Sequence, residues 1–497
     1  MKKKFFYSAA LALFFGVSYA QVETFDLSDF KLPYLRYERL DLDFGLNSQN
    51  QFNSWKDTTD FNFSSSNISS RFNTGGIYSL YLNTPKQQSS YTIYTDIQIR
   101  PFNRSESVYN DESSAISSFS RMNFLISGSS RNRFYNRNRW FIETGPKIDL
   151  GYNLNNFKTI EKDPAGNTIY ERIIKENNPQ LNAGIEIGGG YGRIENVTDA
   201  QMALFILKDL LKENRLEKDP THQEIYKLAE LISRKRTQRF FDDRHRVIAQ
   251  IGAIDSLLTS MGLVNQSDAT YFTTIYDNWL YANNPQRESG FRVSGGPKFD
   301  FSASIFNEST KIIDSPLPDS EFKERYSYID YGFWIRAIDE KPLNHFWQRT
   351  LSANLIYTFS KNTRKVQELP EEQRGQNNLE LTLFGGYRYF PNTRSSVSIG
   401  IQAGWRKNDM ERYFYPVDFD YEEEDLIYER IFAVPNINGY YYFSPRLRFN
   451  FNGSVSYNFY KTDNFMFITP PIQNGFSYVT NNRFNIFINA GFTYALF

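Results

Sequence analysis

The stretch "LRFNFNGSVSYNFY" (residues 447–460) decides the fold, because apolar and polar side chains alternate along its whole length. One face carries Leu447, Phe449, Phe451, Val455, Tyr457 and Phe459, and the other carries Arg448, Asn450, Asn452, Ser454, Ser456 and Asn458. A period of two predicts a β-strand with two unlike faces. Soluble strands average about five to six residues, whereas a strand that crosses a bilayer at a tilt needs about nine to eleven. The length therefore favours a membrane strand over half of a soluble sheet.

The same alternation recurs along the chain. It is clear in "LELTLFGGYRY" (379–389), "VSIGIQAGW" (397–405) and "FRVSGGPKFDFSASI" (291–305), and similar runs occupy roughly residues 91–100, 140–154, 181–191, 327–337 and 351–359. After the first twenty residues there is no run of eighteen apolar residues, so the sequence predicts no transmembrane helix. The repeated pattern predicts an all-β antiparallel barrel that crosses a membrane with its strands.

The composition supports a barrel with a wet interior. The 497 residues include 45 Phe and 34 Tyr, yet the mean hydropathy is −0.55. Abundant aromatic residues in a polar chain fit a barrel with an apolar outside and a polar inside. A net charge of zero gives no sign of nucleic-acid binding. The absence of cysteine excludes disulfides, thiolate chemistry and Cys-ligated metals.

The first twenty residues predict secretion. Lys2, Lys3 and Lys4 precede the apolar stretch "FFYSAALALFFGV" (5–17), and small residues follow at Ser18 and Ala20. This order is typical of a signal peptide that is cleaved after Ala20.

The last residues carry a resemblance. In "RFNIFINAGFTYALF" (483–497), Asn489, Gly491, Tyr494 and Leu496 precede the terminal Phe497. The pattern resembles the terminal signal by which bacterial outer-membrane β-barrels are recognised for assembly. The resemblance implies a location in the outer membrane of a diderm bacterium. It also implies outer-membrane lipid and the barrel-assembly machinery as partners.

One segment departs from the strand pattern. Residues 195–262 lose the period of two, and Thr198 with Gln201, and Thr221 with Glu224, have the spacing of helix capping boxes. Apolar residues then recur at steps of three and four, as in an amphipathic helix. We expect a helical insertion over residues 196–285.

The connections predict the topology. "FPNTR" (390–394) and "FSPR" (443–446) are short, whereas residues 407–430 and 461–482 form long polar connections. Short turns of outer-membrane barrels face the periplasm. Eight candidate strands between 290 and 496 then place the insertion in the periplasm, or as a plug of the barrel. Seven candidates precede it, where an even number is needed, so one candidate between residues 34 and 83 is in error and the barrel has 14 or 16 strands. The expected parts are a signal peptide (1–20), a lead (21–33), the first half of the barrel (34–195), the insertion (196–285) and the second half (286–497).

An echoed motif supplies the candidate site. "GPKID" (145–149) and "GPKFD" (296–300) place proline on the apolar face and charged side chains on the other. Because proline removes a ladder donor, we expect a β-bulge at each. The expected lumen-facing residues are Lys147, Asp149, Glu186, Arg292, Lys298 and Asp300. They form either a constriction of mixed sign that screens solutes or pairs that only neutralise one another inside a wet barrel.

Other chemistry receives little support. The three histidines, His222, His245 and His345, have no metal-ligand or catalytic spacing, so we expect no catalytic residue, no cofactor and no enzyme. The acidic stretch 418–425 offers Asp418, Asp420 and Glu422 as candidate ligands of Ca²⁺ or Mg²⁺; a solvated acidic loop is the alternative.

These observations favour a porin-like channel or transporter for small polar solutes, with weak ion selectivity because the predicted charges have both signs. The alternative is a barrel scaffold or receptor. Its periplasmic helical insertion would then dock a protein partner, such as part of an export or assembly machine, or a surface polymer.

Overall fold

The computed structural model describes residues 24–32, 34–56, 62–108, 113–163, 167–237, 243–281, 287–313, 318–412, 424–444, 446–466 and 475–494. The predicted signal peptide and the last three residues of the predicted assembly signal lie outside these ranges. Both therefore stay predictions.

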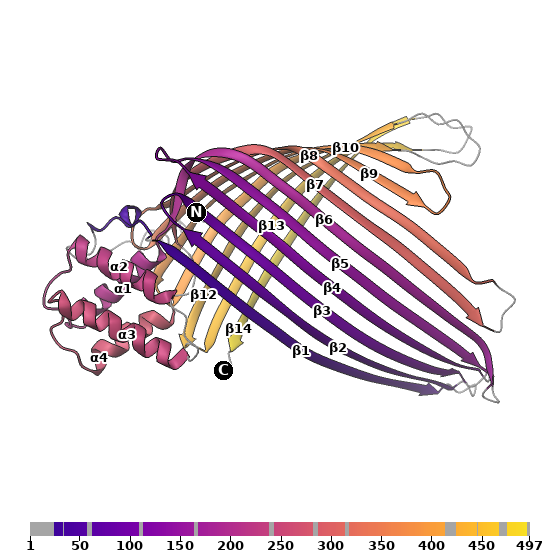
Figure 1. Cartoon of the computed structure of the whole chain (residues 1–497), viewed down its shortest axis with the longest axis horizontal. Coiled ribbons are helices and arrows are strands. Elements are labelled where there is room, and N and C mark those ends of the chain that lie inside the picture. The colour runs from indigo at the N-terminus through magenta and orange to yellow at the C-terminus, as the bar shows by residue number, and fades with distance from the viewer. Residues whose placement is uncertain are drawn as a thin grey trace, which may run out of the picture.

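Fourteen antiparallel strands form one sheet, and each strand pairs with its neighbours in sequence (Figure 1). Within the described residues, this confirms the predicted all-β antiparallel class and the lower of the two predicted strand numbers. The strands are β1 (Leu35–Lys56), β2 (Asn62–Asn83), β3 (Gln87–Val108), β4 (Ser113–Tyr135), β5 (Trp140–Lys162), β6 (Thr168–Asn196), β7 (Glu288–Ile313), β8 (Ser320–Pro342), β9 (Trp347–Val366), β10 (Glu372–Asn392), β11 (Ser395–Arg412), β12 (Glu424–Ser444), β13 (Leu447–Met466) and β14 (Gly475–Tyr494).

The eight strands expected after the insertion are present, whereas six rather than seven precede it. The excess prediction falls between residues 34 and 83, where β1 and β2 are two strands of 22 residues each. Both strands continue through stretches that are polar on both faces, such as "NSQNQ" (47–51). Loss of alternation inside a continuous strand therefore imitated a boundary.

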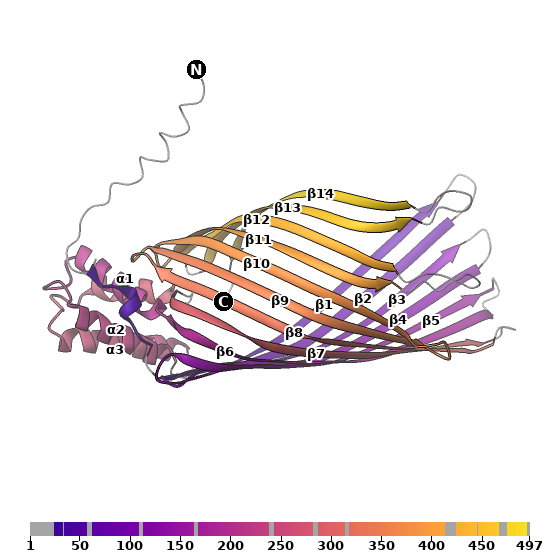
Figure 2. The same cartoon turned by 90° about the horizontal axis from the view of Figure 1, so that it is seen from above.

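The sheet curls so strongly that its first and last strands overlap in two perpendicular views, with the first strands in front in Figure 1 and behind in Figure 2. Its two faces differ as the alternation predicts. Apolar side chains such as Ile399 and Ile401 of β11 are exposed on the outer face, whereas inner-face polar side chains such as Thr358 and Ser360 of β9 are crowded and buried. β1 and β14 form the two edges, and the described residues show no ladder between them.

The expected bulges at the prolines are absent. The register of β5 against β6 runs unbroken through Pro146, and that of β7 against β8 through Pro297. On the other side of each strand, the ladder skips two positions and resumes in the same register. The missing proline N–H is therefore accommodated by an interrupted ladder and no residue is inserted.

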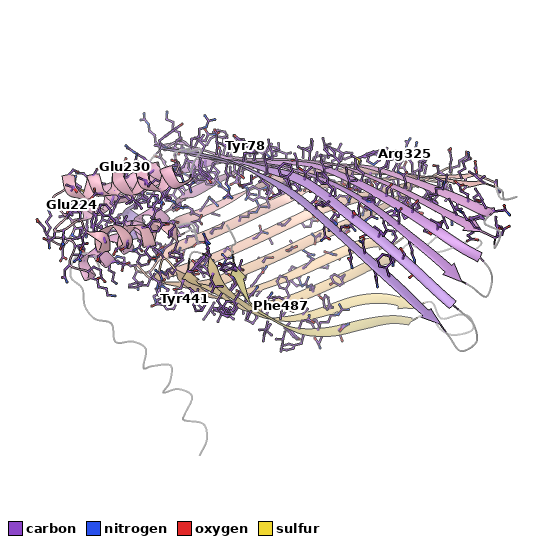
Figure 3. The ribbon with its side chains drawn as sticks, turned by 90° about the horizontal axis from the view of Figure 1, so that it is seen from below. Tyr78, Glu224, Glu230, Arg325, Tyr441 and Phe487 are labelled. Carbon is purple, nitrogen blue, oxygen red and sulfur yellow. The ribbon has the colours of Figure 1, made fainter. Side chains whose placement is uncertain are left out.

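Four helices lie between β6 and β7: α1 (Thr198–Lys212), α2 (His222–Arg236), α3 (Asp243–Ser260) and α4 (Ala269–Leu280). They share a core with the segment before β1, in which Phe25, Leu27 and Phe30 are buried against them. None of the helices in the described part of the chain is long and apolar enough to cross a membrane. The described residues of 24–32 and 198–281 together are called the helical cap. Figure 3 shows Glu224 and Glu230 of α2 at one end of the molecule and Arg325 of β8 towards the other.

One predicted capping box is confirmed and the other is wrong. Thr221 and Glu224 cap α2 reciprocally. At α1 the first N–H is taken by Asn196 at the end of β6, whose side chain accepts from Thr198 N at 2.9 Å. The Thr198 hydroxyl instead accepts from the backbone N–H of Arg287 at 2.8 Å, because the two chain crossings between sheet and cap run side by side there.

Candidate functional site

A belt of ion pairs crosses the inner face of β5 to β8. Lys147 Nζ lies 2.8 Å from Asp300, and Lys298 Nζ lies 3.0 Å from Asp300 and 3.3 Å from Asp330. Lys147 reaches across β6 because Gly184 separates it from Asp300 in the register. A Cβ atom at Gly184 would lie 2.1 Å from the Asp300 carboxylate and 2.5 Å from Lys147 Cε. The two echoed motifs therefore meet over a glycine.

Glu186 belongs to a second set of pairs in the same belt. Arg336 of β8 holds both of its oxygens, at 2.7 and 2.8 Å, and Arg131 of β4 approaches to 3.4 Å. Arg131 also lies 3.3 Å from Glu143, which Arg133 contacts at 2.9 Å. Sequence analysis missed Asp330, Glu143 and the three arginines. Alternation places each on the polar face, but the pairing depends on cross-strand register.

Trp334 of β8 fills the wall beside this belt, with 1% of its surface exposed. The guanidinium of Arg336 lies 4.7 Å from the centre of the indole ring. Gly188 of β6 makes room for the ring, because a Cβ atom there would lie 2.9 Å from it. Gly188, the first residue of "GGGYG" (188–192), thus serves the packing of the inner wall.

The remaining candidates do not join these pairs. Asp149 accepts a hydrogen bond from the Ser127 hydroxyl at 2.5 Å, and Arg292 faces Gly192 and Ile338 nearer the cap. Asp418, Asp420 and Glu422 lie outside the described residues. Within the described ranges, no three His, Asp or Glu side chains gather as metal ligands.

Two cations of the belt are much more exposed than the acids that they contact, whereas Lys298 and Asp300 are exposed to the same extent, 17% and 18%. Lys147 is 52% exposed against 18% for Asp300, and Arg131 is 43% exposed against 2% for Glu143. The carboxylates lie in the wall and the cations lie over them. At Lys147 and Arg131 the inner surface therefore presents positive charge, although the pairs are neutral.

The helical cap is mounted on a two-stranded ribbon, the ends of β6 and β7 next to the helices. The ribbon bends at Gly192 (φ +96°) and Gly290 (φ +128°). Both φ values lie in the region that only glycine adopts freely. A Cβ at either position would also lie 2.1 Å from a carbonyl oxygen of the opposite strand. Glycine is therefore required twice where the ribbon turns towards the cap.

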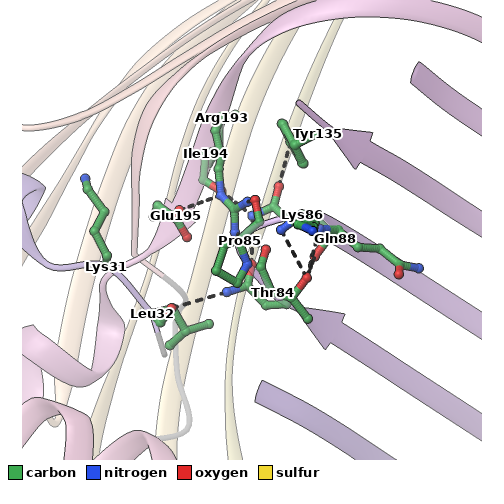
Figure 4. Close-up of polar contacts among 12 residues, drawn as sticks. Lys31, Leu32, Thr84, Pro85, Lys86, Gln88, Tyr135, Arg193, Ile194 and Glu195 are labelled. Atoms are coloured by element: carbon green, nitrogen blue, oxygen red, sulfur yellow. Dashed lines mark hydrogen bonds and ion pairs between the residues drawn. The ribbon is translucent and has the colours of Figure 1, made fainter. Parts of the chain in front are cut away.

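Arg193 anchors the β6 side of the ribbon to the turn between β2 and β3 (Figure 4). Its guanidinium donates to Asn83 Oδ1 at 3.0 Å, Thr84 O at 2.9 Å and Pro85 O at 3.1 Å. Glu195 balances the charge at 2.6 Å. Arg193 thus ties the end of β6 to the turn between β2 and β3, which lies three strands away in the sheet.

Arg287 anchors the β7 side to the turn between β8 and β9. It is fully buried, and its guanidinium donates to His345 O at 2.5 Å, Trp347 O at 2.7 Å and the Gln348 side chain at 3.2 Å, as well as to Asn344 O. Burial lowers the pKa of Arg287 to about 9, so the side chain is still charged at neutral pH.

Two further turns contact the cap. Arg394, between β10 and β11, forms an ion pair with Asp277 of α4. Tyr281 packs against Tyr442 near the turn after β12, with ring centres 5.2 Å apart. The cap and the ribbon that carries it therefore contact the short turns after β2, β8, β10 and β12, and the cap lies at that end of the sheet (Figures 1 and 2).

No protein-family model matches the chain, and no curated protein matches its sequence. Among solved structures, the chain is similar to the toluene transporter TodX of P. putida, at 8% identity and a TM-score of 0.24 over 95% of this chain and 93% of that one. A second is BauA, the ferric preacinetobactin receptor of Acinetobacter baumannii, at 6% identity and a TM-score of 0.11 over 93% and 80%. TM-scores this low carry no argument about function.

Proposed function

We propose that the protein is an outer-membrane channel or transporter for small polar solutes, with the helical cap on the periplasmic side. The opposite character of the two faces of the curled sheet carries this proposal. The outer face exposes apolar side chains, and the inner face carries ion pairs and amides. An apolar band outside and a polar lumen are the properties of a transmembrane β-barrel.

The proposal includes closure of the sheet by pairing of β1 with β14. Both edge strands present unpaired backbone groups, and hydrocarbon supplies no partner for them. Closed barrels of eight strands are filled by side chains, whereas those of sixteen to eighteen hold an aqueous channel. Fourteen strands lie nearer the second case, so the belt and the cap then set how far the lumen is open.

Planar bilayers containing the full mature chain test this function. We expect discrete conductance steps. Removal of the Arg394–Asp277 contact by Arg394→Ala should increase the open time, because the ion pair between α4 and the turn after β10 is lost. Arg364→Ala is the matched control, since Arg364 pairs with Glu324 far from the cap. If neither the native chain nor Arg394→Ala conducts, the channel proposal is wrong.

Single cysteines test the orientation, because the chain has none of its own. Lys218→Cys in the cap should resist a membrane-impermeant maleimide in intact cells and react after the outer membrane is opened. Glu371→Cys, in the turn between β9 and β10, should react in intact cells. The reverse pattern would place the cap outside the cell and contradict the proposed topology.

The alternative function, a scaffold or receptor, is favoured by one feature of the cap. A cleft lies between the segment before β1 and α2, lined by Phe25, Asp29, His222, Tyr226, Lys227 and Glu230. If the protein is a scaffold or receptor, we propose that a periplasmic partner binds in this cleft. Crosslinking from Glu230→Cys in cells distinguishes the two functions: a specific protein adduct, combined with no conductance, favours the scaffold.

A further inference from the structure

The inner face of the last strands carries a group of arginines with too few acids. The register places Glu380 of β10 opposite Arg406 of β11, and Arg406 opposite Arg430 of β12. Arg430 in turn lies opposite Tyr460 of β13. Asn458 of β13 lies opposite Arg483 of β14. Three arginines therefore share one patch of wall, on the face opposite the exposed Ile431 and Phe484. The three arginines together are called the arginine patch.

The only carboxylate that the described residues place in this patch is already paired. Glu380 is bonded by Arg406. Arg430 donates to Asn458 Oδ1 at 2.7 and 3.0 Å, and Asn458 is a neutral amide that is 4% exposed. The described residues give Arg483 only an aromatic contact, with its guanidinium 5.7 Å from the ring centre of Tyr460. The patch therefore carries an excess of two positive charges.

Direct opposition of Arg406 and Arg430 needs an explanation. Like charges at directly opposite positions of an antiparallel pair destabilise a sheet. The Phe432 ring offsets part of this repulsion, because the Arg430 guanidinium lies 4.9 Å from the ring centre. A bound anion would remove the repulsion, because a planar guanidinium binds carboxylate and phosphate oxygens in pairs.

The other end of the sheet repeats the arrangement. Arg100 of β3 lies directly opposite Arg121 of β4. Arg121 donates to the neutral side chain of Asn155 at 2.9 Å. The strands between the two groups after closure are β1, whose residues 44–55 include no acid, and β2, whose residues 62–83 include none. Closure of β1 with β14 would therefore leave the excess positive charge of the arginine patch unneutralised by this part of β1.

We propose that the arginine patch, Arg406, Arg430 and Arg483, binds small solutes that carry a carboxylate or phosphate group. This inference rests on the proposed channel function and replaces the weak selectivity expected from the sequence with a preference for anions. The exposed cations of the belt, Lys147 and Arg131, continue the positive surface towards the cap. A lining of one sign concentrates the opposite ions by tenfold or more.

Binding is measured on the full chain in detergent at constant ionic strength, by thermal unfolding with succinate and with inorganic phosphate. One or both should raise the midpoint of the native protein, since a ligand of the folded state stabilises it. Arg430→Gln should raise the dissociation constant of the anion at least about tenfold, because one charged hydrogen-bonded contact is lost. Arg364→Gln is the control, because Arg364 has its own carboxylate in Glu324 at 2.5 Å.

Selectivity is measured by the reversal potential across a KCl gradient. Chloride should be preferred by the native chain, and Arg406→Glu with Arg430→Glu should shift the preference towards potassium by about tenfold. Conductance with unchanged selectivity in this variant, or stabilisation by neither anion, would overturn the anion site and leave the channel standing. Stabilisation by anions without any conductance would retain the site and overturn the channel.

Discussion

Replacement of Arg287 by methionine is expected to lower the free energy of unfolding by about 3 to 5 kcal/mol. The loss arises because buried carbonyl groups no longer receive hydrogen bonds from the guanidinium. Arg287 is fully buried and satisfies three backbone carbonyl groups of the turn between β8 and β9. Methionine fills similar volume but donates no hydrogen bond. Chemical denaturation followed by circular dichroism measures the loss.

The same variant should release the cap. Because Arg287 joins β7 to the turn that carries His345, its loss should make the cap helices, such as α2, sensitive to limited proteolysis while the strands stay resistant. Arg287→Lys is the informative control, since lysine retains the charge but not the fork that reaches several carbonyls. Native stability and native protease resistance in Arg287→Met would show that the anchor is not needed.

Gly192→Val is the second substitution with a large expected effect. The position has φ +96°, and a side chain there meets the carbonyl of Phe291 at 2.1 Å. Backbone strain alone costs about 1 to 3 kcal/mol, and the overlap adds to it. We expect a total loss of at least about 3 kcal/mol. Gly290→Val should behave in the same way, because its Cβ meets the carbonyl of Arg193 at 2.1 Å.

A glycine of the cap supplies the opposite expectation. Gly252 lies inside α3, where an added Cβ meets nothing within 4 Å. Gly252→Ala should therefore raise stability by about 1 kcal/mol, the difference in helix propensity. Equal effects of Gly252→Ala and Gly192→Val on the unfolding midpoint would contradict the role assigned to the ribbon bend.

Local sequence pattern was sufficient for the strands and the helical insertion. Alternation in 447–460 and 397–405 predicts which face of β13 and β11 is apolar, because burial on one face of a strand imposes a period of two. It failed in 34–83, where strands continue beyond their apolar part. The continuity of β1 and β2 through their polar stretches can be recognised only when the strand that each one pairs with is known.

The candidate site was predictable only in part, because the sequence shows faces and not neighbours. Lys147 and Asp300 follow from the echoed motifs, but their contact depends on Gly184 between them. Arg406 and Arg430 lie on polar faces of separate strands, and only the register makes them opposite. A single sequence does not reveal which charges lie opposite one another on neighbouring strands, because a shift of the strand register by one residue would separate them.

The length of the strands has a consequence for where solutes first meet the protein. A strand of 22 residues, such as β1, is about 73 Å long at about 3.3 Å per residue, and at a tilt of about 45° it rises about 50 Å. The hydrocarbon of a bilayer is only about 30 Å thick. If the sheet crosses the outer membrane as proposed, about 20 Å of its wall lies beyond the hydrocarbon, so solutes would meet the protein before they reach the lipid.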